Sequence, residues 1–398
     1  MGWEETAEDG QRSSRSGGWR QATSERIERP ALAAGAARRL PAAMLAVHDL
    51  PALRALARQL KVPAADLRTL EKRLFKHRLP VAEVLAALPE AVRGVWAREV
   101  DWTPLTLGTR RDSTRDGASK LALRTRDGLT IESVLLRFAT GRNSVCLSTQ
   151  VGCAAGCAFC ATGRMGLSRN LTAAEIVDQV LQAARLLRAE ERTLRNLVFM
   201  GMGEPLHNEA ALTEAITALR DPARFNFADR FIVVSTVGVP AAMVRFARQF
   251  PGVNLALSLH SAREDVRREL VPLARKHPLA TLRRALEEVT ALQARPVMIE
   301  YLLFEGVTDT AADLAALQAF VSGIPVHLNL IPFNPVAAAG GLRGTAKARR
   351  EEFGAALKRA GLKVTLRYSL GADIDGACGQ LAQKQAGTPA DGAAAEAG

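Results

Sequence analysis

Three of the five cysteines in this 398-residue chain form one short motif. Cys153, Cys157 and Cys160 are spaced as C-x3-C-x2-C. Spacers of two or three residues let one loop fold back and direct several thiolates to one point, where a metal ion or an iron–sulfur cluster is the natural occupant. A structural zinc site is closed by four side chains, whereas three protein ligands leave one position open for a substrate. The motif therefore predicts a metal or cluster site with an open position.

The same spacing also allows a closed zinc site. That site would need a fourth ligand, for which Cys146, Cys378 and His260 are the candidates. The spacing favours a cluster, which Phe159 and Ala161 beside the ligands would shield from water. Cys146 and Cys378 could each be a buried thiol that packs as a small hydrophobe. For Cys378 this is less attractive, because the polar, glycine-rich segment GADIDGACGQL would expose a nucleophilic thiol.

The composition is that of a globular protein in a reducing compartment. The chain is 48% hydrophobic and 24% charged, and five cysteines are too few for a disulfide framework. No apolar run approaches the roughly 18 residues that span a bilayer, and the N-terminus lacks the apolar core of a secretory signal. We therefore expect a cytoplasmic protein with no membrane partner.

The chain is strongly basic, and the excess is uneven. The net charge is +12, and residues 54–127 hold 16 Lys and Arg against 9 Asp and Glu, a net of +7. Such an excess suits a polyanionic partner such as RNA. A solvated helical surface would produce the same count, so charge alone does not decide between the two interpretations.

Composition and periodicity divide the chain into five segments. The two ends lack periodicity and are predicted to be disordered. The predicted segments are a disordered extension at 1–35, a basic helical domain at 40–104, a β extension or linker at 105–140, a barrel at 141–383 and a disordered tail at 384–398.

The first two ordered segments have different periodicities. Leucines recur at helical spacing in the helical domain, and Pro63, Pro80 and Pro89 cut it into short helices. The β extension alternates and contains Asp-Gly pairs at 116 and 127, which predicts a hairpin or meander.

From Val145 onward, apolar strands alternate with amphipathic helices. Strands are predicted at 145–149, 196–200, 231–235, 253–259, 297–303 and 326–331, and helices at 173–189, 209–219, 241–249, 279–293, 311–322 and 347–360. Six βα units in series indicate parallel strands with the helices outside. Because a closed barrel needs eight units, we predict an α/β fold with a partial (βα)6 TIM-like barrel, closed by one more strand and the Cys378 loop.

Polar residues and glycines follow the predicted strands, where barrel enzymes place their chemistry. These are Gly203 and Glu204 in GMGEP, Ser235, Ser258, Leu259 and His260 in SLH, and Asn334. The glycines would let the backbone approach a ligand closely, and Glu204 would accept the ammonium group of a bound amino acid. Each residue alone is common at caps and turns, but their occurrence on successive strands favours a cofactor site.

Together these motifs resemble the RlmN/Cfr family, radical S-adenosylmethionine enzymes that methylate adenine in RNA. The resemblance runs from roughly Ser113 to Leu381 and rests on QVGCAAGCAFCATG, FMGMGEPL, LSLH, IPFNP and RYSLGADIDGACGQL. It implies a partial barrel of the radical SAM type and an N-terminal helical domain that docks RNA. Residues 1–30 have no counterpart in the family.

The resemblance also implies a role for each candidate residue. Cys153, Cys157 and Cys160 would bind a [4Fe–4S] cluster, and the strand-end residues named above would hold S-adenosylmethionine. Cys378 would be methylated on sulfur by a first cofactor molecule. A second molecule, cleaved by one electron from the cluster, would yield a radical that takes hydrogen from the S-methyl group. The resulting carbon radical would add to adenine, whose electron-poor C2 and C8 resist ordinary methylation.

Two further residues complete the implied mechanism. Cys146 would resolve the protein–RNA adduct by a transient disulfide with Cys378. Glu132 is similar to the family's proton acceptor, although one residue more separates it from Cys146 than in the family pattern.

The function that we expect is methylation of adenine C2 in 23S rRNA at the peptidyl-transferase centre, and in tRNA next to the anticodon. Pro205 favours the C2 branch, because the C8 branch has alanine there. The alternatives are a Cfr-like C8 methyltransferase and a non-catalytic RNA-binding metal protein, which would leave Cys378 without a task. We also expect a flavodoxin-like electron donor and a monomeric protein.

Overall fold

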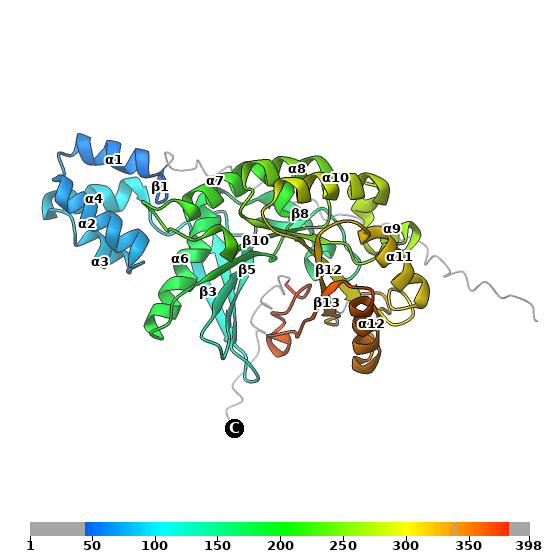
Figure 1. Cartoon of the computed structure of the whole chain (residues 1–398). Coiled ribbons are helices and arrows are strands. Elements are labelled where there is room, and N and C mark those ends of the chain that lie inside the picture. The colour runs from blue at the N-terminus through cyan, green and yellow to red at the C-terminus, as the bar shows by residue number, and fades with distance from the viewer. Residues whose placement is uncertain (1–43, 337–338, 382–398) are drawn as a thin grey trace, which may run out of the picture. The chain divides into compact units, whose positions relative to one another are not determined.

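The computed structural model describes residues 44–336 and 339–381 (Figure 1). The described residues belong to one compact unit that begins at Met44. The predictions for residues 1–35 and 384–398 lie outside the described residues, and the boundaries proposed near 104 and 140 stay predictions. None of the helices in the described part of the chain is long and apolar enough to cross a membrane.

The N-terminal region folds into short helices, as predicted. These are α1 (Leu50–Gln59), α2 (Ala64–Glu71) with the π-helical turn η1 (Lys72–Lys76), α3 (Val81–Leu85) and α4 (Glu90–Glu99), and strands β1 (Leu45–Ala46) and β2 (Val100–Asp101) pair in parallel beside them. Pro63, Pro80 and Pro89 each occupy the N-cap position of the helix that follows. Proline fixes its own φ and ends the preceding helix, which is why the region is divided at these positions.

The β extension is continuous with the sheet of the barrel. Strands β3 (Leu105–Asp112), β4 (Ala118–Thr125), β5 (Thr130–Arg137) and β6 (Asn143–Cys146) form an antiparallel meander. Strand β6 then pairs in parallel with β9. The predicted meander is confirmed, and its strands belong to the same ten-stranded sheet, in the order β14-β13-β12-β11-β10-β9-β6-β5-β4-β3.

The remaining strands of this sheet are parallel and follow chain order, as in a partial barrel. They are β6, β9 (Asn196–Phe199), β10 (Ile232–Thr236), β11 (Asn254–Ser258), β12 (Val297–Leu303), β13 (Val326–Pro332) and β14 (Lys363–Leu366). The connecting helices are α6 (Ala173–Ala189), α7 (Glu209–Arg220), α8 (Pro240–Gln249), α10 (Leu279–Leu292), α11 (Ala311–Val321) and α12 (Lys347–Arg359). The six predicted βα units and the TIM-like fold class are confirmed (Figure 1).

Several short elements were not predicted. They are the hairpin of β7 (Gln150–Cys153) and β8 (Gly166–Asn170), helices α5 (Ala161–Arg164) and α9 (Glu264–Leu270), and the turns η2 (Pro205–His207), η3 (Asp229–Phe231), η4 (Pro272–Arg275) and η5 (Ala372–Ile374). Each is shorter than the window over which a hydrophobic period can be recognised.

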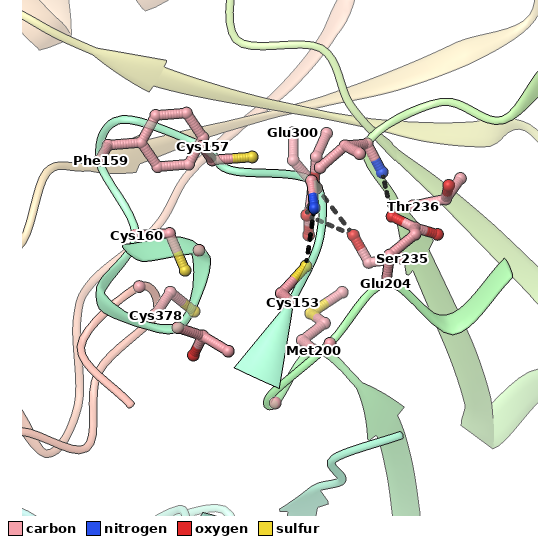
Figure 2. Close-up of a pocket in the computed structure, with 18 of the residues that line it drawn as sticks. Cys153, Cys157, Phe159, Cys160, Met200, Glu204, Ser235, Thr236, Glu300 and Cys378 are labelled. Carbon is pink, nitrogen blue, oxygen red and sulfur yellow. Dashed lines mark hydrogen bonds between the residues drawn. The ribbon is translucent and has the colours of Figure 1, made fainter. Parts of the chain in front are cut away.

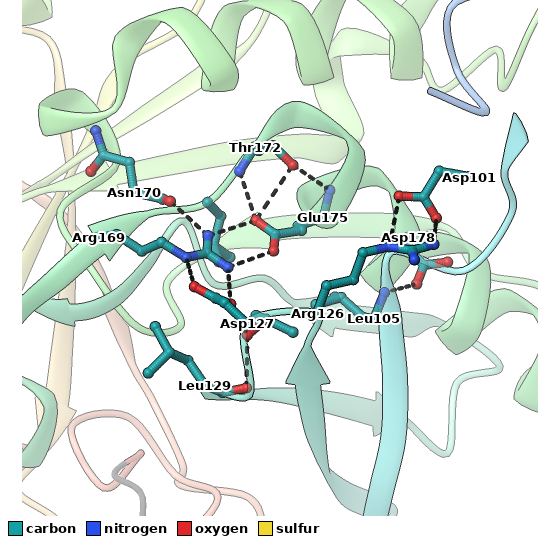
Figure 3. A network of polar contacts seen from close by, with 12 residues as sticks. Asp101, Leu105, Arg126, Asp127, Leu129, Arg169, Asn170, Thr172, Glu175 and Asp178 are labelled. Atoms are coloured by element: carbon teal, nitrogen blue, oxygen red, sulfur yellow. Dashed lines mark hydrogen bonds and ion pairs between the residues drawn. The ribbon is translucent and has the colours of Figure 1, made fainter. Parts of the chain in front are cut away.

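Arg169 fastens the β extension to the barrel (Figure 3). Its guanidinium donates two hydrogen bonds to Asp127 in the β4–β5 turn, at 2.7 and 2.8 Å. It donates two more to Glu175 in the first turn of α6, at 2.9 and 2.8 Å. Glu175 also forms a capping box with Thr172 at the start of α6. The hydrogen bonds from Arg169 hold the pKa of Asp127 well below its usual range.

Replacing Arg169 with methionine is expected to lower the free energy of unfolding at pH 7 by about 2 kcal/mol, because charge-assisted hydrogen bonds are lost. The depressed pKa of Asp127 stabilises the fold above the unfolded carboxyl pKa of about 3.9, and this share is lost progressively as pH falls below that value. Urea unfolding at pH 7 and pH 3 measures the effect. The difference between wild type and R169M should shrink at pH 3, and an undiminished difference would contradict this account.

Candidate active site

Most of the predicted site residues gather in one cavity at the C-terminal ends of the parallel strands (Figure 2). The predicted residues that line it are Cys153, Cys157, Cys160, Gly203, Glu204, Ser235, Ser258, His260 and Cys378. Four further predicted residues are not among those that line the cavity: Cys146, Glu132, Leu259 and Asn334. The positions are given by the structure, while the individual roles stay predictions.

The cysteine motif lies in the connection between β7 and β8. Cys153 is the last residue of β7, and Cys160 directly precedes α5. Gly152 has a φ of 80°, and a Cβ there would collide with the carbonyl oxygen of Gly166, so the close crossing of the two strands requires glycine. A buried apolar shell packs around the motif: Ala155, Phe159, Leu270, Val271, Ala274, Leu302 and Phe304.

The three thiols suit a cluster better than a single metal ion. Among residues 44–336 and 339–381, no group of three or more His, Cys, Asp or Glu side chains is arranged to hold one ion. The three thiols line the same cavity, and their role as ligands of one occupant stays a prediction. The sulfur ligands of one zinc ion lie about 4 Å apart, because each Zn–S bond is about 2.3 Å. Cluster ligands are spread over separate iron atoms.

The electrostatics of these thiols agree with a cationic occupant. Burial raises the pKa of Cys153 to about 12. Burial also raises the pKa of Cys157 well above its usual value, and the charges of Cys160 and Cys153 add to the effect. A thiolate in this apolar shell is therefore unstable by itself, and bound iron would compensate its charge. The donor set of three thiols consequently fits an iron–sulfur cluster.

The glycines of GMGEP pack against the chain itself. A Cβ on Gly201 would lie 2.7 Å from the carbonyl oxygen of Leu147. Gly203 has a φ of 101°, and a Cβ there would lie 2.9 Å from the backbone nitrogen of Gln150. The close approach that these glycines permit is to Leu147, which precedes β7, and to Gln150, the first residue of β7. Their expected approach to a ligand stays a prediction. Gly203 nevertheless contributes to the cavity wall.

Glu204 presents a buried carboxylate to the cavity (Figure 2). It accepts hydrogen bonds from the backbone N–H groups of Leu206, at 3.0 Å, and Val237, at 2.8 Å. Burial raises the pKa of this carboxyl group. An ammonium group in the cavity would stabilise the carboxylate, which agrees with its predicted contact to the amino acid end of the cofactor.

Glu300 is a second buried carboxylate in the cavity, and the sequence analysis missed it. It lies on β12 and accepts hydrogen bonds from the hydroxyl groups of Ser235, at 2.9 Å, and Ser258, at 3.0 Å. Burial raises its pKa. The two serines therefore do not act alone, because their hydroxyl protons are directed to Glu300. The charged residue inside the apolar strand MIEYLL was the signal that could have identified it.

His260 contributes an uncharged ring. Burial lowers its pKa to about 3, and the charge of Arg267 adds to the effect. Its Nδ1 accepts a hydrogen bond from the N–H of Leu302 at 3.2 Å, which assigns the proton to Nε2. The ring packs edge-on against Phe159, with centroids 4.7 Å apart. Leu259 is fully buried, so its contribution to a cofactor site is limited to its backbone.

The loop with Cys378 lies against the cysteine motif (Figure 2). The side-chain amide of Asn334 donates to the carbonyl oxygen of Cys378 at 3.1 Å. The N–H of Ala161, directly after the third cysteine of the motif, donates to the carbonyl oxygen of Gly379 at 2.8 Å. A Cβ on Gly379 would lie 3.1 Å from the carbonyl oxygen of Phe159. Glycine after the cysteine thus allows the two loops to touch.

Cys378 and Cys146 lie within electrostatic range of each other. Cys378 is exposed, as expected, but its thiol opens into the cavity, where desolvation and the charge of Glu300 raise its pKa to about 11. Burial raises the pKa of Cys146, and the charge of Cys378 raises it further. Both thiols are therefore protonated at neutral pH, so an accessible thiol at position 378 still needs activation to become a nucleophile.

Glu132 lies on β5 and pairs with Lys120 on β4, with 3.2 Å between Oε1 and Nζ. The sequence analysis did not identify Lys120 as a residue of the site.

Arg267 is a further residue that the sequence analysis missed. It is fully buried and donates hydrogen bonds to three carbonyl oxygens at the ends of β10 and β11, those of Ser258, Leu259 and Val237. It braces these strand ends beside the cavity.

Single replacement of Cys153, Cys157 or Cys160 with alanine is expected to abolish cluster binding, because each removes one of three iron ligands. Anaerobic reconstitution with iron and sulfide, followed by iron analysis and visible absorption, measures the effect. Wild type should hold about four iron atoms. Cys378→Ala is the matched control and should hold the same amount. Full iron content in all three motif variants would show that the motif is not the ligand set.

Comparisons with known proteins agree with this site. A model of the radical SAM superfamily matches residues 147–317. A probable RNA methyltransferase of Rhodopirellula baltica is 46% identical over 338 residues, covering 85% of this chain and 87% of that protein. A probable dual-specificity RNA methyltransferase RlmN of Thermus thermophilus is 41% identical, covering 75% of this chain and 83% of that protein.

A solved structure of a radical SAM methyltransferase from Sphaerobacter thermophilus is also similar. It is 39% identical with a TM-score of 0.81, and the match covers 85% of this chain and 99% of that chain. The two sequences are therefore similar over most of their length, and not only in the cysteine motif. The chain therefore belongs to the RlmN family of radical S-adenosylmethionine methyltransferases.

Proposed function

We propose that this protein methylates C2 of an adenine in 23S rRNA, at the peptidyl-transferase centre, and of an adenine next to the anticodon in tRNA. The relative from Thermus thermophilus is named a dual-specificity RNA methyltransferase. The observation that carries the proposal is the accessible Cys378 thiol, held against the cysteine motif in the same cavity as two buried carboxylates. Pro205 in GMGEP supports the C2 branch.

The family uses a [4Fe–4S] cluster and S-adenosylmethionine. Bound together, they supply the one-electron chemistry that ring carbons of adenine require. In the proposed reaction the three motif cysteines hold the cluster. Glu204 accepts a hydrogen bond from the ammonium group of the cofactor. The other polar groups of the cofactor form hydrogen bonds with Ser235, Ser258 and Glu300. Two cofactor molecules are used per turnover, one for the methyl group and one for its activation.

The two remaining thiols divide the transfer between them. Cys378 carries the methyl group as a thioether and presents it to the base. Glu132 accepts the proton that leaves the ring carbon. Cys146 then attacks the sulfur of Cys378, so that an S–S bond forms as the S–CH2 bond to the RNA breaks. The methylene carbon keeps the electron pair of that bond and takes a proton to become the methyl group, and a dithiol reductant returns the disulfide to two thiols before the next turnover. The charge of Cys378 is one cause of the raised pKa of Cys146, which supports this pairing.

RNA docking is proposed for the helical region and the rim of the cavity. Exposed basic side chains of the helical region would contact phosphates, and they include Arg58, Lys61, Arg68 and Lys72. Tyr368 lies just beyond β14 and is 84% exposed, which suits stacking on a base. The target adenine must leave its stack to enter the cavity.

We further propose that the protein is a cytoplasmic monomer and that a flavodoxin-like protein donates the electrons that reduce its cluster.

Nucleoside mass spectrometry tests the proposed function. RNA from cells lacking the protein should gain 2-methyladenosine when incubated anaerobically with the reconstituted enzyme, S-adenosylmethionine and a reductant. Cys378→Ala should yield none, although it keeps its cluster, because the methyl carrier is gone. Cys146→Ala should accumulate a covalent protein–RNA adduct, because its release is blocked.

The outcomes separate the alternatives. A product of 8-methyladenosine without 2-methyladenosine would assign the protein to the C8 branch. No methylated nucleoside and no release of 5′-deoxyadenosine would favour a non-catalytic RNA-binding protein. Methylation by Cys378→Ala at the wild-type rate would refute the two-thiol mechanism.

A further inference from the structure

The β3–β4 hairpin holds the loop that carries Cys378. The N–H of Gly371, at the start of the loop, donates to the carboxylate of Asp116 at 2.8 Å. The carboxylate of Asp373 accepts from the hydroxyl of Ser113 at 2.8 Å and from the N–H of Thr114 at 3.1 Å. These contacts join segments about 255 residues apart in the chain. The β extension is thus one support of the loop that carries Cys378.

One face of the extension lies beneath this loop. In the sheet register, Lys120 pairs with Val134, and Val134 pairs with Cys146, so the three residues form one row across β4, β5 and β6. Side chains in such a row point to the same face, and so does Glu132, two residues from Val134. Cys146 is influenced by the charge of Cys378. The face with Lys120 and Glu132 is therefore the one that the Cys378 loop covers.

Lys120 bridges the two parts of the site. Its Nζ lies 3.2 Å from Oε1 of Glu132 and donates to the carbonyl oxygen of Asp375 at 3.3 Å. The side chains of Lys120 and Glu132 are only 9% and 8% exposed. An ammonium group loses much hydration at such a position, so it is retained only where partners replace the water. Asp375 is three residues before Cys378, and these contacts set the distance between Glu132 and the loop.

We infer that Lys120 is a positioning residue that holds the Glu132 carboxylate and the Cys378 loop in one fixed arrangement. The inference rests on the proposed function, in which Glu132 accepts a proton and Cys378 carries the methyl group. Lys120 itself need not touch the RNA base. One ammonium group contacts both partners, so its removal takes an ion-pair partner from the Glu132 carboxylate and an anchor from the loop at the same time.

The test compares Lys120→Met, Lys120→Arg and Arg169→Met in the anaerobically reconstituted holoenzyme. Arg169→Met is the matched control, because it weakens the attachment of the extension without touching Glu132 or the loop. Hydrogen–deuterium exchange of a peptide covering residues 371–381 reports on the loop, and kcat and KM for RNA report on catalysis.

Lys120→Met should show faster exchange in residues 371–381 and a kcat reduced about ten- to hundred-fold, with KM for RNA nearly unchanged, because misplacement affects the reacting groups and not RNA docking. Lys120→Arg should keep the loop exchange and kcat close to those of wild type, since a guanidinium can also contact the Glu132 carboxylate and the Asp375 carbonyl oxygen. Arg169→Met should leave the exchange of the loop and kcat near wild type.

Wild-type exchange and kcat in Lys120→Met would overturn the inference. It would also be overturned if Arg169→Met reproduced both changes, because general weakening would then be sufficient. If Lys120→Met does not fold, the double variant Lys120→Met/Glu132→Gln also removes the buried negative charge that has lost its lysine. Faster exchange of residues 371–381 in this double variant would support the bridge, and unchanged exchange would refute it. If wild type makes no methyladenosine, the proposed function fails, while the exchange comparison still tests the bridge.

Discussion

The cavity brings together thiols and carboxyl groups, which are negatively charged when they lose their protons, in an environment that solvates negative charge poorly. The motif thiols lie in an apolar shell, and the carboxylates of Glu204 and Glu300 are buried in the same wall. Burial raises the pKa of each of these carboxyl groups, and of Cys153 and Cys157. Such a cavity is stabilised by an occupant that brings positive charge. Iron and a sulfonium cofactor with an ammonium group both do so, which links the fold to its chemistry.

The architecture explains how a single open sheet serves two tasks. Its parallel part collects strand ends around the cavity, as in other barrels of this type. Its antiparallel part supplies the face with Lys120, Glu132 and Cys146, beneath the Cys378 loop. Because β6 belongs to both parts, the proposed resolving thiol of Cys146 is positioned by the same ladder of backbone hydrogen bonds as the strands around the cavity.

Much of the fold could be predicted, because its signals are local. The six βα units have clear hydrophobic periods, and Pro63, Pro80 and Pro89 divide the helical region where the structure divides it. The β7–β8 hairpin was missed because its strands are four and five residues long. The first parallel strand was predicted, but its antiparallel pairing with β5, which joins the extension to the barrel sheet, was missed, because alternation predicts strands and not their partners.

The site was predictable where spacing or an unusual residue type indicates chemistry, as for the cysteine motif and Glu204. Glu300 and Lys120 were missed although each interrupts an apolar strand. Arg267 could not have been distinguished from Arg268 in the segment EDVRREL, since only tertiary packing buries one and exposes the other. The three thiols of the motif line one cavity, and their role as cluster ligands stays a prediction.

The central claim is that the methyl group passes to RNA by way of the sulfur of Cys378. It is tested most directly by a pulse and chase: the enzyme is incubated with S-adenosylmethionine that carries a deuterated methyl group, freed of it, and then given RNA and unlabelled cofactor. Peptide mass spectrometry should find the label on Cys378, and the first methyl group to enter RNA should carry deuterium. An unlabelled first methyl group, or label on Cys146 and not on Cys378, would contradict the account.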